Sequence, residues 1–104
     1  MKTPTKSDAK HLKDLCAAIV SLESVDEARR FLVDLCTPAE LTAMADRWRV
    51  AKLLKRDVPY RKIYERTGVS TATVTRVART LSHGEGGYEI LLSRFAAQKN
   101  EDED

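Results

Sequence analysis

The sequence predicts an all-α protein of six helices, and three observations carry that prediction. Apolar residues recur at intervals of three and four along most of the chain, which is the spacing of one helix face. Helix start signals, in which Ser or Thr is followed three residues later by Glu, precede two of these stretches. No stretch alternates apolar and polar residues as a half-buried strand would. Because 104 residues supply too little core for two independent domains, we expect one helical domain over residues 1–104.

The first two predicted helices are short and amphipathic. Ser7 is the expected N-cap of the first and Ser24 of the second, where Ser24 and Glu27 have the spacing of a capping box. The apolar stripes comprise Leu12, Leu15, Cys16, Ile19 and Leu22 in the first helix and Ala28, Phe31, Leu32 and Leu35 in the second. Because Cys16 and Cys36 lie on apolar faces with no apolar leader ahead of them, we expect both thiols to be reduced core residues.

The third helix has the strongest start signal. Thr37 is the predicted N-cap, Pro38 takes the first helical position, where no N–H is needed, and Glu40 completes a capping box. We expect this helix to run to about Lys55. Its inward positions are Leu41, Met44, Ala45, Trp48, Ala51 and Leu54 or its neighbours. Because Trp48 belongs to this stripe, we interpret it as a core or interface anchor rather than as a platform on which a base stacks.

Proline and glycine divide the rest of the chain. Residues 57–59, Asp-Val-Pro, end the third helix, and two short helices are expected over residues 60–67 and from 71 to about 81. Gly86 and Gly87 then precede a last helix from residue 88 to about 97. This last helix offers Leu91, Leu92 and Phe95 to the core or to a partner subunit.

Residues 60–81 have the pattern of a helix-turn-helix. Gly68 stands where the first helix must end, and glycine reaches the positive φ of a C-terminal cap without a Cβ clash. Val69 is expected to plug the space between the helices, and Ser70 to cap the second helix, with Thr73 three residues on. The inward positions are Ile63 and Thr67 in the first helix and Val74, Val77, Ala78 and Leu81 in the second. Tyr64 stands where a small residue usually lets the helices cross closely, so its ring must turn aside or fill a gap.

Charge is unevenly distributed along the chain. The net charge is only +2, yet residues 45–83 hold ten Lys and Arg against three acidic residues, a net charge of +7, whereas residues 21–40 carry −3. The basic segment contains the helix-turn-helix and is the predicted polyanion surface. Small side chains at the start of the second helix allow close approach to base edges, and the backbone N–H groups that follow Ser70 suit phosphate. The outer and flanking positions of that helix are Thr71, Ala72, Thr73, Thr75, Arg76 and Arg79.

These residues resemble the Trp repressor superfamily, and most closely its YerC/YecD-like branch. The resemblance covers nearly the whole chain and is clearest in LCTPAELTAMADRWRVAKLL and YRKIYERTGVSTATVTRV. It implies a Trp repressor-like intertwined homodimer, with dimerisation helices in residues 8–58 and 88–98, the helix-turn-helix in 59–82, and flexible ends at 1–7 and 99–104. In such dimers two recognition helices lie roughly 34 Å apart and enter successive major grooves of double-stranded DNA. The resemblance places Thr71, Ala72, Thr73 and Thr75 at the groove, and Arg61 and Lys62 near the DNA backbone.

The same resemblance bears on a ligand. Members that respond to tryptophan hold it with two arginines and a following glycine, and Arg47 and Arg76 match those arginines, whereas Val77 replaces the glycine. A branched side chain where an indole needs close backbone approach should obstruct binding, so we predict that tryptophan is not the corepressor. For Arg47 and Arg76, structural ion pairs or phosphate contacts are favoured over another bound anion.

Other functions fit the sequence less well. His11 and Cys16 are five residues apart and therefore on different helix faces, so we expect no metal site, no cofactor and no enzymatic activity. No apolar run approaches the roughly 18 residues that cross a membrane, which predicts a soluble cytoplasmic protein. The expectation is a sequence-specific transcriptional regulator, acting as a repressor. Two alternatives are a pair of packed helices with a merely solvated basic surface, and a helical protein-interaction module whose basic face grips an acidic partner. Sigma-factor and transposase DNA-binding domains also resemble the pattern, but they are normally parts of longer chains.

Overall fold

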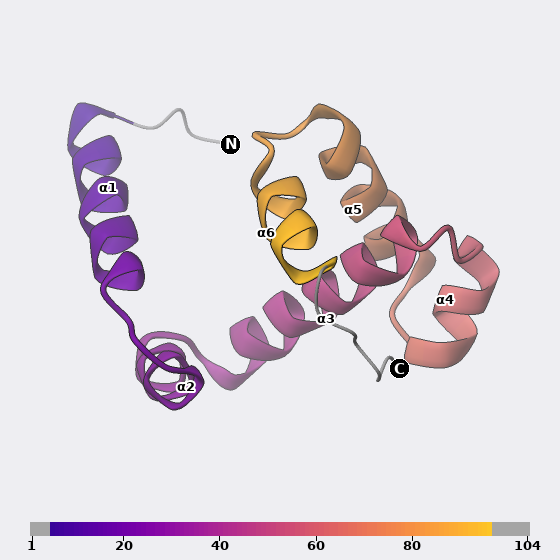
Figure 1. The fold of residues 1–104 in the computed structure, drawn as a ribbon, viewed down its shortest axis with the longest axis horizontal. Coiled ribbons are helices and arrows are strands. Elements are labelled where there is room, and N and C mark those ends of the chain that lie inside the picture. The colour runs from indigo at the N-terminus through magenta and orange to yellow at the C-terminus, as the bar shows by residue number, and fades with distance from the viewer. Residues whose placement is uncertain (1–4, 97–104) are drawn as a thin grey trace. The chain divides into compact units, whose positions relative to one another are not determined.

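Six α-helices follow one another along the part of the chain that the computed structural model describes, residues 5–96 (Figure 1). They are α1 (Lys6–Val20), α2 (Val25–Leu35), α3 (Pro38–Lys55), α4 (Tyr60–Thr67), α5 (Thr71–His83) and α6 (Gly87–Ala96). This confirms the prediction of an all-α protein. The chain divides into two compact units, Met1–Pro38 and Ala39–Asp104, which we call the N-terminal and C-terminal units.

The first helix begins two residues before its predicted cap. Thr5 is the N-cap: its Oγ1 accepts a hydrogen bond from the Asp8 backbone N–H at 3.0 Å, and its own N–H donates to Asp8 Oδ2 at 3.1 Å. The prediction of Ser7 was wrong because Thr5 has an acidic partner three residues on, whereas Ser7 has Lys10 there. Residues 6 and 7 are therefore helical and do not belong to a flexible end, while the other predicted end, 99–104, lies outside the described residues.

The predicted capping box of the second helix is half formed. Ser24 Oγ accepts a hydrogen bond from the Glu27 backbone N–H at 3.0 Å, as expected. The Glu27 carboxylate accepts from the backbone N–H of Glu23, also at 3.0 Å, so it satisfies the residue before the cap. Both acceptors still serve backbone donors at the start of α2, which explains why the helix begins at Val25.

The N-terminal unit buries none of its helical residues. Neither α1 nor α2 contains a buried side chain, and Leu12 and Ile19 of the predicted stripe are 61% and 45% exposed. Cys16 is an exposed free thiol and Cys36 a half-buried one, so the prediction that both are core residues is wrong for the single chain. Two short helices have no third element in their own unit to cover their stripes, and the residues of their apolar faces are half-buried or exposed.

The C-terminal unit has a closed hydrophobic core. Its buried residues are Val50, Ala51 and Leu53 from α3, Ile63 from α4, Val69 from the turn, Val74 and Val77 from α5, and Leu92 from α6. In α3 the prediction that Ala45 points inward was wrong, because only the second half of that helix enters the core and Ala45 precedes it. In α6, Leu92 is buried as predicted, whereas Leu91 and Phe95 remain exposed. Leu91 and Phe95 therefore stay available to a partner.

The two later helix boundaries differ slightly from those expected. α5 continues to His83, past the predicted end near Leu81, because the Gly84 N–H still donates to the Thr80 carbonyl oxygen at 2.8 Å. α6 begins at Gly87, directly after Gly86, whose φ is +85°. Across residues 5–96, no helix is both long enough and apolar enough to pass through a bilayer.

Candidate nucleic-acid interface

A glycine-capped turn joins α4 to α5. Gly68 has φ +75° and ψ 1°, the left-handed conformation predicted for it, and its N–H donates to the Tyr64 carbonyl oxygen at 2.8 Å. A Cβ at this position would meet no atom within 4 Å, so the requirement for glycine comes from the backbone angle and not from crowding. The turn thus depends on one residue type at one position.

Side-chain hydrogen bonds hold the same turn from inside. Thr67 Oγ1 donates to the Ile63 carbonyl oxygen at 2.7 Å and accepts from the Val69 N–H at 3.0 Å. Val69 is only 8% exposed and belongs to the core cluster with Ile63 and Val74, which confirms its predicted role as a plug. The sequence had assigned Thr67 only an inward direction. Its hydroxyl in fact connects the last turn of α4 to Val69 in the turn before α5.

The start of α5 is capped as predicted. Ser70 Oγ accepts from the Thr73 backbone N–H at 3.2 Å and donates to Thr73 Oγ1 at 3.1 Å. The two hydroxyl groups therefore engage each other, and Thr73 is half-buried rather than fully exposed. Thr73 acts mainly in holding the first turn of α5, and the open surface of that turn is formed by Thr71, Ala72 and Thr75.

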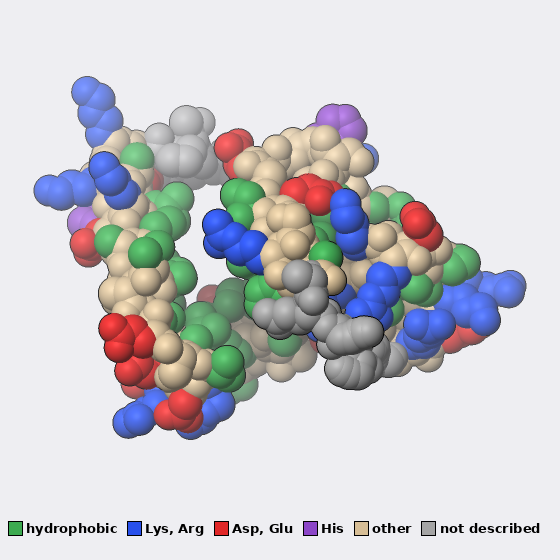
Figure 2. All heavy atoms as spheres, viewed as in Figure 1, with side chains coloured by type: hydrophobic (Ala, Val, Ile, Leu, Met, Phe, Trp, Pro, Cys, Tyr) green, Lys and Arg blue, Asp and Glu red, His purple; other side chains and the backbone are tan. Residues whose placement is uncertain are grey.

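All the predicted DNA-binding residues but Thr73 are exposed, and they lie on α4, at the cap Ser70 and on α5. Val74 and Val77 lock the opposite face of α5 into the core, so its outer face is presented by a rigid support. Figure 2 shows Lys and Arg side chains gathered over α4. The exposed members of the predicted set are Arg61, Lys62, Ser70, Thr71, Ala72, Thr75, Arg76 and Arg79.

Glu65 and Tyr64 also lie on the exposed surface of α4. Arg61 Nε lies 3.8 Å from Glu65 Oε2, one helical turn on, with both side chains largely in solvent. Such an exposed pair contributes little to stability. Tyr64 is 50% exposed, so its ring is not enclosed between α4 and α5.

The residues matched to a tryptophan pocket are differently placed. Arg47 is half-buried on α3 and Arg76 is exposed on α5. Val77 is 1% exposed within the core cluster, so its branched side chain fills interior space. The obstruction of a tryptophan site by Val77 stays a prediction.

Trp48 is anchored by two aromatic rings that the sequence did not pair with it. Its ring lies 6.5 Å from that of Tyr88, at an interplanar angle of 10°, and 5.9 Å from that of Phe95, at 80°. Lys52 Nζ lies 6.0 Å from the centre of the indole. Trp48 is therefore a packing anchor, as interpreted from its stripe. The available signal for its partners was the placing of Tyr88 and Phe95 two turns apart on α6.

Comparison with known proteins gives consistent matches. The family model described as Trp repressor protein matches residues 10–96. The uncharacterized protein YerC of Bacillus subtilis (strain 168) is 41% identical over 96 residues, which is 92% of each chain. The solved structure of a TrpR like protein from Eubacterium eligens ATCC 27750 is 38% identical, with a TM-score of 0.80 over 88% of this chain and 94% of that one. A structure from Staphylococcus aureus also has a TM-score of 0.80, at 37% identity, and covers 88% and 91% of the two chains.

Proposed function

The chain belongs to the Trp repressor family, and from this premise we propose that it is a sequence-specific DNA-binding regulator of transcription that acts as a homodimer through α4 and α5. One observation carries the proposal. The capped first turn of α5 exposes Thr71, Ala72 and Thr75, while Val74 and Val77 hold its other face in the core. A rigid helix that presents small side chains within a basic segment fits a DNA major groove.

The chemistry of that turn suits base recognition. A threonine offers both a hydroxyl and a methyl group, and Ala72 can contact the methyl group of a thymine. Arg76 and Arg79, further along α5, can reach guanine or a phosphate. Thr73 supports this surface by holding the cap with Ser70 and is not proposed to read bases through its hydroxyl.

Contacts to the DNA backbone come from charge and from helix ends. Arg61 and Lys62 are exposed in the first turn of α4, the helix that crosses the backbone in this class of motif. The first N–H groups of α5 suit phosphate, since they have no acceptor within the helix. These contacts position the protein on the duplex without selecting a sequence.

Exposed apolar side chains on the helices support a homodimer. Large apolar side chains that remain exposed are Leu12, Ile19, Val20, Val25, Val33 and Leu35 in the N-terminal unit and Ile90, Leu91 and Phe95 in α6. A second copy presents the same faces, so a twofold arrangement covers both sets at once. It also places two recognition helices about one DNA turn apart, roughly 34 Å in this class.

The proposal includes the sign and setting of regulation. The protein acts as a repressor in the cytoplasm, has no enzymatic role, and does not use tryptophan as corepressor, since Val77 stands where the tryptophan-responsive members have a glycine. An isothermal titration with tryptophan is expected to show no saturable binding at micromolar concentration. Stoichiometric binding in that range contradicts this part of the proposal.

A selection of bound sequences from random DNA, repeated with variants, tests the main proposal. The wild type is expected to select a near-palindromic site, and its affinity should fall by roughly 10³- to 10⁵-fold between 50 and 200 mM salt if 6 to 10 phosphates are contacted. The double variant Thr71→Ala, Thr75→Ala should lose about tenfold or more of the preference for that site and keep its affinity for bulk DNA. Thr42→Ala, on an exposed position of α3, is the matched control.

The outcomes separate the alternatives. If the threonine variant keeps the wild-type ranking of sequences, α5 is not the reading helix. If the wild type shows no preferred sequence at any salt concentration, the proposal fails.

A further inference from the structure

Basic side chains continue from the α4 surface back to α3. Residues 52–66 hold six Lys and Arg against two acidic residues, Asp57 and Glu65, a net charge of +4. Only residues 56–59 join α3 to α4, so these charges stay close together along the chain. We call four of the basic residues the basic strip: Lys52 on α3, Arg56 in the turn that follows, and Arg61 and Lys62 in the first turn of α4. Lys52 is half-buried, and the other three are exposed.

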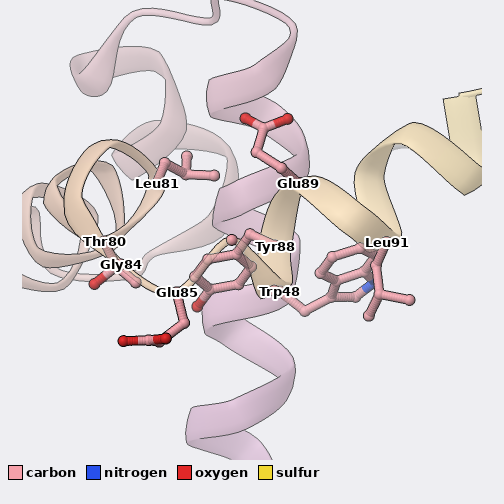
Figure 3. Close-up of a pocket in the computed structure, with 10 residues that line it drawn as sticks. Trp48, Thr80, Leu81, Gly84, Glu85, Tyr88, Glu89 and Leu91 are labelled. Atoms are coloured by element: carbon pink, nitrogen blue, oxygen red, sulfur yellow. The ribbon is translucent and has the colours of Figure 1, made fainter.

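The end of α6 lies beside the start of this strip. Glu89, near the start of α6, pairs with Lys55 at the end of α3, whose Nζ lies 3.0 Å from Glu89 Oε1. Phe95, near the end of α6, has its ring 5.9 Å from that of Trp48, so α6 runs antiparallel to α3. Figure 3 shows Glu89 lying over α3 and Trp48 reaching from α3 toward α6. Because Lys52 Nζ lies 6.0 Å from the centre of the same indole, the last turn of α6 is close to Lys52.

The sequence that follows α6 ends in four consecutive acidic residues. Residues 97–104 lie outside the part of the chain that the structure describes, and residues 101–104, which we call the acidic segment, carry a net charge of −4. The acidic segment begins five residues and ends eight residues beyond Ala96, the last residue of α6, and an extended chain of that length spans at most about 18–29 Å. Arg56 lies only about 6 Å further along the chain than Lys52, at the rise of an α-helix. The basic strip is therefore within reach of the acidic segment.

From these charges and this geometry we infer that the acidic segment docks on the basic strip of its own chain and competes there with DNA phosphates. Its four carboxylates match the net charge of +4 over residues 52–66. A tether of so few residues holds the segment at an effective concentration on the order of millimolar, so a contact too weak for a separate acidic partner is still populated. DNA must displace the segment before Arg61 and Lys62 contact phosphates, which lowers the apparent affinity. This competition rests on the proposed function of α4 and α5 in DNA binding.

NMR spectra of labelled protein test the docking without DNA. The neutral-segment variant removes all four charges, by Glu101→Gln, Asp102→Asn, Glu103→Gln and Asp104→Asn. At about 20 mM salt, the backbone amide resonances of the basic strip are expected to differ between the wild type and this variant. The difference should vanish by about 300 mM salt, because ions screen exposed charges. The matched control removes four carboxylates at exposed positions elsewhere and should keep the wild-type resonances of the strip: Asp14→Asn, Glu23→Gln, Asp34→Asn and Glu85→Gln.

Two results overturn the docking. The first is identical resonances of the basic strip in the wild type and the neutral-segment variant at about 20 mM salt. The second comes from refolding labelled neutral-segment chains together with an excess of unlabelled wild-type chains. The labelled strip should keep the resonances of the variant. If it takes on those of the wild type, the acidic segment of a second copy occupies the strip, and the assignment to the same chain is wrong.

DNA titration then tests the competition. At about 50 mM salt, the neutral-segment variant should bind the selected DNA site at least about fivefold more tightly than the wild type, and the gain should fade by about 200 mM. The control variant should gain less than about twofold. No gain, or an equal gain in the two variants, rejects the competition alone. Docking in a protein that selects no DNA sequence rejects the proposed function and leaves the docking assignment standing.

Discussion

The N-terminal and C-terminal units use the same helical pattern with opposite results. In α1 and α2, apolar residues recur at helical spacing and none of them is buried. In α3 to α6, a similar supply of apolar residues closes over a core of eight buried side chains. The difference shows that an amphipathic pattern indicates which face will be covered but not which element covers it. For the N-terminal unit, the proposed cover is a second chain.

The largest expected effect follows from charging the open face of α1. Replacing both Leu12 and Ile19 with Asp should convert the dimer to monomers and lower the thermal unfolding midpoint by more than about 10 °C. Each of these side chains contributes about 1.5–3 kcal/mol when buried, and a buried carboxylate without a partner costs more. Sedimentation velocity and calorimetry measure the two changes.

Ala17→Asp is the matched control for that experiment. Ala17 is exposed on the other side of α1 from the Leu12 stripe, and its variant introduces one of the two carboxylates that the double variant introduces. It should sediment as the wild type does. If the double variant also sediments unchanged, the open face of α1 is not the dimer interface.

The next largest effect is expected in the closed core of the C-terminal unit. Ile63 is fully buried beneath the turn, so Ile63→Ala should lower the free energy of unfolding by about 2–5 kcal/mol through lost contacts and a cavity. Because Ile63 faces its own chain, the folded variant should still sediment as a dimer. Urea titration gives the first quantity and sedimentation the second. A loss below about 1 kcal/mol would mean that the core does not close around Ile63.

A smaller effect separates two glycines of the C-terminal unit. Gly68→Ala should lose about 1–2 kcal/mol, because alanine is strained at φ +75°. Gly87→Ala should be neutral or gain up to about 1 kcal/mol, since Gly87 begins α6 without positive φ and a Cβ there meets open space. Urea titration of the two variants side by side provides the measurement. Equal losses would contradict the assignment of strain to the Gly68 backbone.

Features set by near neighbours in sequence were predicted best. The left-handed Gly68 and the cap that Ser70 forms on Thr73 each follow from residues within one turn, and both are confirmed. The wrong prediction of Ser7 as the first N-cap shows the limit of this reasoning. Thr5 is the N-cap because it has an acidic partner, Asp8, three residues on. The sequence near a helix start predicts the N-cap well only when all candidate cap residues there are compared.

Features set by distant parts of the chain were predicted less well. In α3, Ala45 was placed inward although the core begins further along at Val50, because burial depends on where α4 to α6 pack against that helix. The prediction that Cys16 is a core residue was wrong for a related reason, since nothing in the N-terminal unit buries its apolar stripe. In the candidate site, exposure was predicted correctly for all members but Thr73, whose hydroxyl turns to Ser70.

The smallest expected effect compares the same loss of negative charge in the two units. Glu65→Gln removes the partner of Arg61 and raises the net charge of residues 45–83 by one, so DNA affinity at 50 mM salt should rise about two- to threefold. Asp34→Asn, in the acidic part of the N-terminal unit, makes the same change of charge and should leave affinity unaltered. Fluorescence anisotropy with labelled DNA measures both variants, and the gain should fade by 200 mM salt because ions screen exposed charges. Equal gains in the two variants would mean that DNA senses only the total charge of the protein, whereas a gain confined to Glu65→Gln places the phosphates beside α4.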